Sequence, residues 1–388
     1  MANIFDYLKD RGHISFEEDP FNEVDNVILA QLSYTDFDGI KDMEDGFLPV
    51  KEVQDQYFKI NRREEVENRK TLVAQAPFLL DYLAKAPRFK DLKLGFYENI
   101  IDPEKTGQFS ALVFDLPHMI YIAYRGTDDT IVGWKEDFYF SFSAYTMGQK
   151  NAVAYADEVL DKLDKNKEIH LGGHSKGGNL ATYAGVFCRK DLRDRIKVIW
   201  DNDGPGFSKE FLQKENYKLI KNKIIRIIPQ TSIVGLLMEN EVNPIIINSD
   251  ASLILQHQAE SWQVEGNKFV REKLLSKEAI FIEKSLTLWL EQIPHGQRRK
   301  FVDAVFACME MAGYKTVSGL SSDGIKGLKN IKDAADNLQE DDQKIILKLL
   351  NMLIDNSRKV FRERLKERIK EERIKRKEVG IIPRFRKS

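Results

Sequence analysis

The feature that most constrains the fold of this chain is a short apolar run that leads into a glycine-rich turn and then into a helix-forming segment. Residues 169–171 read Ile-His-Leu, residues 172–178 read Gly-Gly-His-Ser-Lys-Gly-Gly, and residues 179–188 are spaced as in a helix. Strand, G-x-S-x-G turn and helix in this order are typical of a nucleophile elbow, which presents a serine at the carboxyl edge of a parallel sheet. The motif predicts an α/β fold with Ser175 at that edge, and the alternative is a glycine-rich turn with an incidental serine.

The pattern on either side of the motif supports an α/β fold. From about residue 60 to residue 270, helix-period segments alternate with runs rich in Val, Ile, Tyr and Phe. We expect helices over residues 63–85, 151–163 and 179–188, and strands over residues 94–100, 111–114, 119–124, 168–171, 196–200 and 223–228. The second and third of these strands should form an antiparallel hairpin, because only a short Leu-Pro-His link separates them.

Beyond about residue 271 the strand signals stop, and charged amphipathic stretches follow at residues 273–293, 297–311 and 341–378. Between them, residues 318–327 carry three glycines and three serines and are expected to be a loop or linker. The chain is therefore expected to contain an α/β domain over residues 1–270, a helical region over residues 271–356 and a basic helical tail over residues 357–388.

Composition narrows the possible functions and the compartment. Lys+Arg number 60 and Asp+Glu number 61, so no overall charge attracts the molecule to nucleic acid. Two cysteines and an N-terminus without an apolar signal segment indicate the cytoplasm. The apolar stretches are far shorter than the roughly 20 residues that span a bilayer. We find no phosphate loop, dinucleotide fingerprint or His/Cys cluster, so neither a cofactor nor a metal is expected.

A serine nucleophile in such an elbow needs a base and an acid, which follow it in the order serine, acid, histidine. Two histidines follow Ser175. His257 precedes a predicted strand over residues 262–270, whereas His295 lies between two predicted C-terminal helices, so we predict His257 as the base. The strand over residues 196–200 ends in Asp-Asn-Asp-Gly-Pro and predicts Asp203 as the acid, with Asp201 as the alternative. A turn in which the carboxylate only caps backbone amides is the structural explanation for either aspartate.

Two further segments carry a family resemblance. Residues 121–129 read Tyr-Ile-Ala-Tyr-Arg-Gly-Thr-Asp-Asp and residues 133–137 read Gly-Trp-Lys-Glu-Asp; together with the elbow they resemble the class-3 (fungal-type) lipases, which are serine esterases of the α/β-hydrolase fold. Lys176 in the elbow, the sequence Asp-Gly-Pro-Gly-Phe at residues 203–207, residues 20–25 and 32–34, and Gln-His at residues 256–257 followed by Trp262 resemble an Mbeg-like bacterial family of lipase-like hydrolases. This second resemblance covers roughly residues 15 to 310.

The resemblance implies an α/β-hydrolase that cleaves carboxylic esters, with lipid esters among the candidates, through an acyl-enzyme. It implies that Thr127 holds the oxyanion, together with the backbone N–H of Lys176. The class-3 lipases would place the acid at the position of Ser232, and a serine cannot carry that charge. The acid must then come from elsewhere, or the chain is a noncatalytic binding or scaffold protein on a hydrolase fold. Residues 138–145 correspond to the lid neighbourhood and, like residues 233–238, are candidates for an acyl-chain wall or for core.

The last 31 residues carry 14 Lys+Arg and five Glu, a net charge of +9, which leaves −10 on the remaining 357 residues because the whole chain carries −1. Phe361, Leu365 and Ile369 recur four residues apart, as expected for a helix that docks on a partner, an anionic membrane surface or a nucleic-acid backbone. Several Glu residues lie three or four positions from Arg or Lys and would also support a solvated single helix, which is the favoured interpretation.

Overall fold

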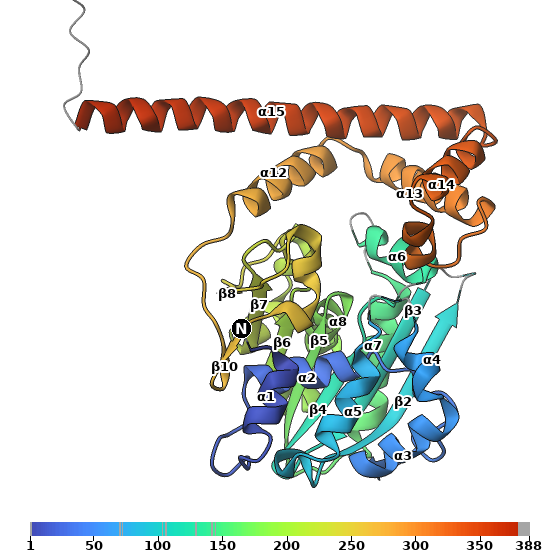
Figure 1. The fold of residues 1–388 in the computed structure, drawn as a ribbon, viewed down its shortest axis with the longest axis vertical. Helices are drawn as coiled ribbons and strands as arrows, with labels where there is room; N and C mark the ends of the chain where they lie inside the picture. The colour runs from blue at the N-terminus through green and yellow to red at the C-terminus, as the bar shows by residue number, and fades with distance from the viewer. Residues whose placement is uncertain are drawn as a thin grey trace, which may run out of the picture.

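The computed structural model describes residues 2–69, 71, 73–102, 104, 107–128, 130–140, 143 and 145–378. Within these residues a sheet of eight strands runs in sequence order from β1 to β8 (Figure 1). The strands are β1 (Phe47–Pro49), β2 (Lys93–Asp102), β3 (Gly107–Asp115), β4 (Met119–Tyr124), β5 (Glu168–His174), β6 (Ile196–Asn202), β7 (Ile224–Pro229) and β8 (Ile245–Ile247). Pairing is antiparallel from β1 to β4 and parallel from β4 to β8. The expected α/β architecture and the β3–β4 hairpin are confirmed.

Helices cover both faces of the sheet. The helices before and between the strands are α1 (Ile4–Arg11), α2 (Glu23–Leu32), α3 (Val50–Ile60), α4 (Arg63–Glu67), α5 (Leu79–Leu83), α6 (Ile131–Tyr139), α7 (Met147–Leu160), α8 (Lys176–Phe187), α9 (Lys190–Arg195), α10 (Lys209–Leu212) and α11 (Glu215–Ile220). Helices α1, α2, α3 and α5 share a core with one face of the sheet, and α7, α8, α9 and α11 share a core with the other. Strand β4 shows why: Tyr121 and Ala123 join the first core, while Ile120 and Ile122 join the second, because successive strand side chains point to opposite faces.

The C-terminal region is helical and lies along the carboxyl end of the parallel strands (Figure 1). It contains α12 (Lys277–Glu291), α13 (His295–Met311), α14 (Val317–Ala335) and α15 (Glu340–Glu378). A third core joins this region to α6, with Ile131 packed among Trp289, Phe301 and Phe306. The backbone N–H of Ile131 also donates to the carbonyl of Lys315 at 3.0 Å. Helix α6 is the first helix after β4, so the C-terminal helices contact the body near the end of that strand.

Three local predictions are wrong. The helix expected over residues 63–85 is instead α4, which ends at Glu67, a 3₁₀ turn at Ala76–Phe78 and α5; Pro77 lies at the start of the 3₁₀ turn, where its missing N–H costs no hydrogen bond. The loop expected over residues 318–327 lies inside α14, where apolar residues recur with helical spacing despite the glycines. The strand expected over residues 262–270 is a short hairpin of β9 (Val264–Glu265) and β10 (Lys268–Phe269), because Gly266 turns the chain with φ +62°.

Among the described residues, the helices that are long enough to cross a bilayer are too polar to do so.

Candidate active site

Ser175 lies between the end of β5 and the start of α8, in a backbone conformation that side chains rarely adopt. Its φ is 57° and its ψ is −132°, and its backbone N–H donates to the carbonyl of Asn202 on β6 at 2.9 Å. Such a conformation costs about 1–3 kcal/mol and persists only where the surroundings impose it. The serine is 9% exposed. The structure thus forms the sharp strand-to-helix turn that the elbow motif predicts.

The glycines of the motif allow the close packing of this turn. A Cβ atom on Gly173 would lie 2.4 Å from the carbonyl carbon of Gly177, and one on Gly177 would lie 2.0 Å from the carbonyl oxygen of Tyr124. Carbon atoms at these distances from backbone atoms overlap sterically. Only glycine fits at both positions, and the first turn of α8 therefore packs directly against the end of β4.

His257 and Asp203 are in hydrogen-bond contact with each other near the serine. Nδ1 of His257 lies 2.6 Å from Oδ2 of Asp203, which is fully buried just after β6. His257 ends a 3₁₀ helix at Leu253–His257 and keeps 21% of its side chain exposed. Its ring lies 4.6 Å, centroid to centroid, from the ring of His174, the residue before Ser175. Among the described residues no hydrogen bond joins Ser175 to His257; this contact often closes only in the substrate complex.

Asp201, the alternative acid, points elsewhere. Its Oδ1 accepts the backbone N–H of Gly204 at 2.9 Å, and its Oδ2 lies 3.6 Å from Nε of Arg226. Burial raises the pKa of Asp201 to about 7. Asp201 therefore caps the turn that follows β6, while Asp203, with φ 55°, turns toward His257.

Ser232, which stands where the class-3 resemblance would place the acid, contacts Asp203. Its hydroxyl donates to Oδ1 of Asp203 at 2.5 Å and accepts the backbone N–H of Gly235 at 3.0 Å. The two oxygens of Asp203 thus have two different partners, Ser232 and His257. The serine holds the carboxylate in place without supplying the charge.

The 3₁₀ helix that presents His257 is fixed by its neighbours. The side-chain oxygen of Gln256 accepts the backbone N–H of Thr231 at 2.8 Å, after β7. The indole N–H of Trp262, which is fully buried, donates to the carbonyl of Gln256 at 2.8 Å. Both residues belong to the Gln-His and Trp pattern on which the family resemblance rests, and both position the backbone that carries the imidazole.

His174 connects the elbow to His257 and to the N-terminal segment. Its Nε2 lies 2.8 Å from the carbonyl oxygen of His257, so this nitrogen carries the proton, and its Nδ1 lies 3.1 Å from the hydroxyl of Tyr34. Burial holds the pKa of His174 well below its usual value, so the ring is neutral. The role of Tyr34, which lies just after α2, could not be read from the sequence beyond its part in the resemblance.

The loop after β4 brings Thr127 to the elbow. A Cβ atom on Gly177 would lie 3.1 Å from the backbone nitrogen of Gly126, so the two backbones are in contact. The hydroxyl of Thr127 donates to Oδ2 of Asp137 at 2.5 Å, while Oδ1 of Asp137 is buried without a hydrogen-bond partner among the described residues. Burial raises the pKa of Asp137 to about 7. With Asp137 ionised, the hydroxyl of Thr127 is occupied, which leaves the backbone N–H groups of Thr127 and Lys176 as candidate oxyanion donors.

The Lys176 side chain has a structural partner that was not predicted. Its Nζ lies 3.0 Å from Oε2 of Glu136, and both side chains are almost fully buried. Nζ also donates to the carbonyl of Gln108 at 3.1 Å, and Glu136 accepts the backbone N–H of Gly148 at 2.6 Å. The pair ties the first residue of α8 to α6 and to β3. Both residues stand in the motifs of the sequence, but a pairing across forty positions has no local signal.

The two candidate acyl-chain walls lie in different surroundings. Of residues 138–145, the ring of Phe138 packs 5.8 Å from that of Phe306, and the hydroxyl of Tyr139 donates to Asp303 at 2.5 Å, so this part faces α13. Residues 141, 142 and 144 lie outside the described residues. Residues 233–238 are mostly half-buried and include a 3₁₀ turn at Val234–Leu236. His295, the histidine not chosen as base, begins α13.

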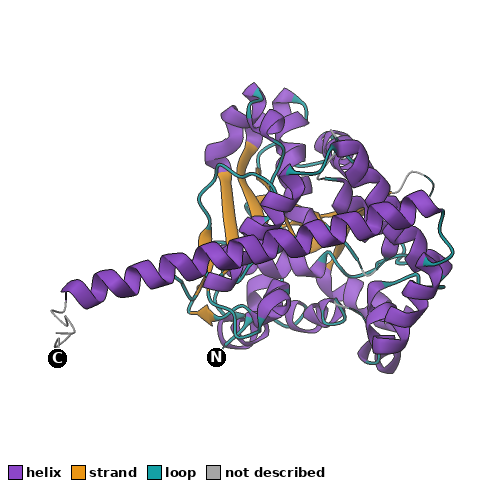
Figure 2. Ribbon diagram, turned by 90° about the horizontal axis from the view of Figure 1, so that it is seen from above, coloured by secondary structure: helices purple, strands orange, loops and turns teal. Residues whose placement is uncertain are grey.

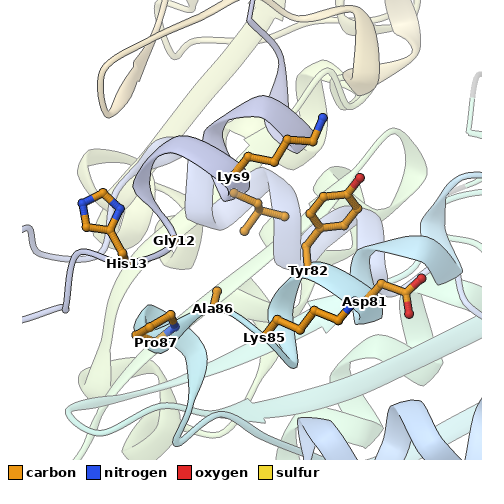
Figure 3. A pocket seen from close by; sticks show the side chains of 9 residues that line it. Lys9, Gly12, His13, Asp81, Tyr82, Lys85, Ala86 and Pro87 are labelled. Carbon is orange, nitrogen blue, oxygen red and sulfur yellow. The ribbon is translucent and has the colours of Figure 1, made fainter.

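Two of the cavities differ in how they lie relative to the candidate site. A cavity of about 450 Å³ is lined by residues of α1 and α5, among them Lys9 and Tyr82 (Figure 3), and shares no residue with the site. A smaller cavity of about 180 Å³ is lined by Tyr34, which contacts His174, and by Arg125 and Asp128 on either side of the oxyanion loop. The smaller cavity therefore adjoins the candidate site, and its lining combines charged side chains with apolar ones such as Val73 and Ile101.

No group of three or more His, Cys, Asp and Glu side chains within the described part of the chain is arranged to hold a metal ion.

A mostly parallel sheet with helices on both faces, a serine in a sharp turn after β5, an aspartate after β6 and a histidine in a later loop are the arrangement of the α/β-hydrolase fold. Residues 83–307 match the model of the Mbeg1-like family, and the chain belongs to that family. Among solved structures, the crystal structure of M37 lipase is 13% identical, with a TM-score of 0.34, and the match covers 83% of this chain and 97% of that one. A comparison with curated proteins gives no match.

Proposed function

We propose that the protein is a serine carboxylester hydrolase with Ser175, His257 and Asp203 as its triad. The observation that carries the proposal is the 2.6 Å contact between His257 Nδ1 and buried Asp203, next to an elbow serine with φ 57°. An imidazole whose Nδ1 faces a carboxylate carries its proton there and offers Nε2 as the base. No comparable arrangement is needed to stabilise a turn.

In the proposed reaction, the Ser175 hydroxyl attacks the ester carbonyl while His257 Nε2 takes its proton. His257 then returns the proton to the leaving alcohol, and water hydrolyses the acyl-enzyme by the same route. Asp203 holds the imidazole and stabilises its positive charge. Backbone N–H groups of Thr127 and Lys176 would receive the developing negative charge on the carbonyl oxygen, and the N-terminus of α8 points at the same place.

The alternative, a noncatalytic binding or scaffold protein, lacks an activated serine, and labelling with a fluorophosphonate separates the two. We expect full-length protein to be labelled and Ser175→Ala to lose both labelling and the hydrolysis of p-nitrophenyl esters. A loss of about 10⁴-fold or more in turnover is typical for a triad serine. Circular dichroism and thermal melting check that the variant is folded. Labelling of folded Ser175→Ala, or no labelling of the unsubstituted protein, contradicts the proposal.

A further inference from the structure

Helix α15 has one apolar side that the body covers. Leu349 and Val360 are buried on this side. The indole N–H of Trp289 on α12 donates to the carbonyl of Leu349 at 2.8 Å, and Asn356 hydrogen-bonds with Gln292 at 3.1 Å. These contacts fix the rotation of α15 about its axis and decide which of its residues face outward.

A second apolar side of the same helix has no cover within the described part of the chain. It consists of five side chains that are each between 43% and 62% exposed, which we call the outer stripe: Leu347, Leu350, Ile354, Phe361 and Leu365. At 3.6 residues per turn, their spacing places them together, about a third of a turn away from Leu349 and Val360. The sequence pattern showed apolar residues only from Phe361 onward. The outer stripe begins 14 residues earlier, at Leu347, and is about 27 Å long.

The third side of α15 is basic. It carries five exposed cations, which we call the basic side: Lys344, Lys348, Lys359, Arg362 and Lys366. Exposed acids also lie on or beside this side of the helix: Glu340, Asp341, Asp355 and Glu363. Glu340 pairs with Lys344 at 2.6 Å and Asp355 pairs with Arg358 at 3.3 Å, so the excess of positive charge lies toward the C-terminal half of α15. The last 31 residues of the chain, which include three of these five cations, carry a net charge of +9.

We propose that the outer stripe and the basic side of α15 dock the protein on an anionic lipid surface. A helix that lies in a membrane interface buries an apolar side in the acyl region and places Lys and Arg among acidic headgroups, and α15 offers both. A nucleic-acid backbone would pair with the cations but leave the five apolar side chains in water. A second copy of the chain on the stripe would bring the same cations close together.

The position of the helix suits this role. Figure 2 shows α15 crossing the helical region and extending beyond the rest of the molecule on one side. Its exposed residues can therefore reach a flat surface without unfolding of the body. The inference concerns attachment and does not depend on the proposed hydrolase activity.

The test measures binding of the full-length protein to vesicles by sedimentation in low salt. One set contains equal parts of phosphatidylcholine and phosphatidylglycerol, and the other contains phosphatidylcholine alone. The stripe variant is Ile354→Asp/Phe361→Asp, and its control is Ile60→Asp/Leu219→Asp, which replaces two equally exposed apolar residues of α3 and α11 and changes the net charge by the same amount. We expect binding to the anionic vesicles only, weakened about tenfold or more in the stripe variant but not in the control.

Several results would overturn the inference. They are failure of the unsubstituted protein to bind anionic vesicles, equal binding by the stripe variant and its control, or equally tight binding to duplex DNA. Light scattering tests whether a second copy of the chain covers the stripe instead. If the unsubstituted protein is a dimer and the stripe variant is a monomer, the stripe is a dimer interface and the inference is wrong. Thermal melting of both variants verifies that they are folded.

Discussion

Asp201 and Asp203 lie two residues apart after the same strand, yet they face different partners. Asp203 contacts His257, while Asp201 caps Gly204 and faces Arg226. We therefore expect Asp203→Asn to lower turnover by about 10³–10⁴-fold, as removal of a triad acid does. Asp201→Asn should lower turnover less than about tenfold and cost about 1–2 kcal/mol of unfolding free energy, because it weakens a buried contact.

Steady-state kinetics and urea unfolding of both variants test this prediction. An Asp201→Asn protein that loses as much turnover as Asp203→Asn while remaining folded would mean that Asp201 is the acid in the substrate complex.

Asp137 gives the stability a distinctive pH dependence. Burial raises the pKa of its carboxyl to about 7, above the value near 4 expected in the unfolded chain. Between these two values the folded protein binds one more proton than the unfolded one, so this group stabilises the fold at low pH and the contribution is lost as pH rises toward 7. Asp137→Asn cannot titrate.

We expect the difference in unfolding free energy between Asp137→Asn and the unsubstituted protein to shift in favour of the variant by at most about 4 kcal/mol from pH 4 to pH 8. Urea unfolding at several pH values measures this difference. A constant difference would show that the carboxyl titrates normally, and Asp10→Asn, at an exposed position of α1, serves as a control.

How much of the site can be predicted from the sequence depends on how far apart in the chain the interacting residues lie. Ser175 was predictable because the turn requires a local pattern of glycines. His257 and Asp203 were chosen by chain order and strand position, and the structure brings them together, although their roles stay predictions. Tyr34 hydrogen-bonds with His174, which lies 140 positions away in the chain, and Ser232 with Asp203, which lies 29 positions away. No local pattern encodes such contacts.

At the scale of elements, the buried pair of Lys176 and Glu136 joins α8, α6 and β3 around the elbow. Removing one partner leaves the other charge buried and unpaired, which costs about 3–5 kcal/mol, whereas removing both is often far less costly. We expect Lys176→Met to lower the unfolding free energy by about this amount and Lys176→Met/Glu136→Gln to recover part of it.

A double-mutant cycle in urea, with Glu136→Gln as the remaining corner, measures the coupling. Additive effects would mean that the two side chains are held independently, and the pair would then have no part in positioning the first turn of α8.

The sequence predicts β4 and α8 well, because their buried side chains recur with the period of a strand or of a helix. The predicted boundaries were wrong where one type of residue and the spacing of the apolar residues indicated different structures. Glycines and serines in residues 318–327 suggested a loop, yet the apolar spacing of α14 prevails, since a glycine in a helix costs only about 1 kcal/mol. In residues 63–85 the apolar spacing predicted one long helix, yet α4 ends at Glu67 and Pro77 stands at the start of a separate 3₁₀ turn before α5.

At the scale of the whole molecule, two truncations test whether the end of α15 is needed for hydrolysis and for the stability of the body. Ending the chain after Lys366 removes 22 residues of net charge +5 and retains the outer stripe and the buried Val360. Ending it after Asn356 also removes Val360, whose burial is worth about 1.5–3 kcal/mol. We expect the first truncation to melt like the full chain and to hydrolyse soluble short-chain esters at a similar rate. The second should melt at a lower temperature because α15 loses a buried side chain. If the first truncation is folded but inactive on soluble esters that the full chain cleaves, the final 22 residues belong to the catalytic unit rather than to an attachment segment.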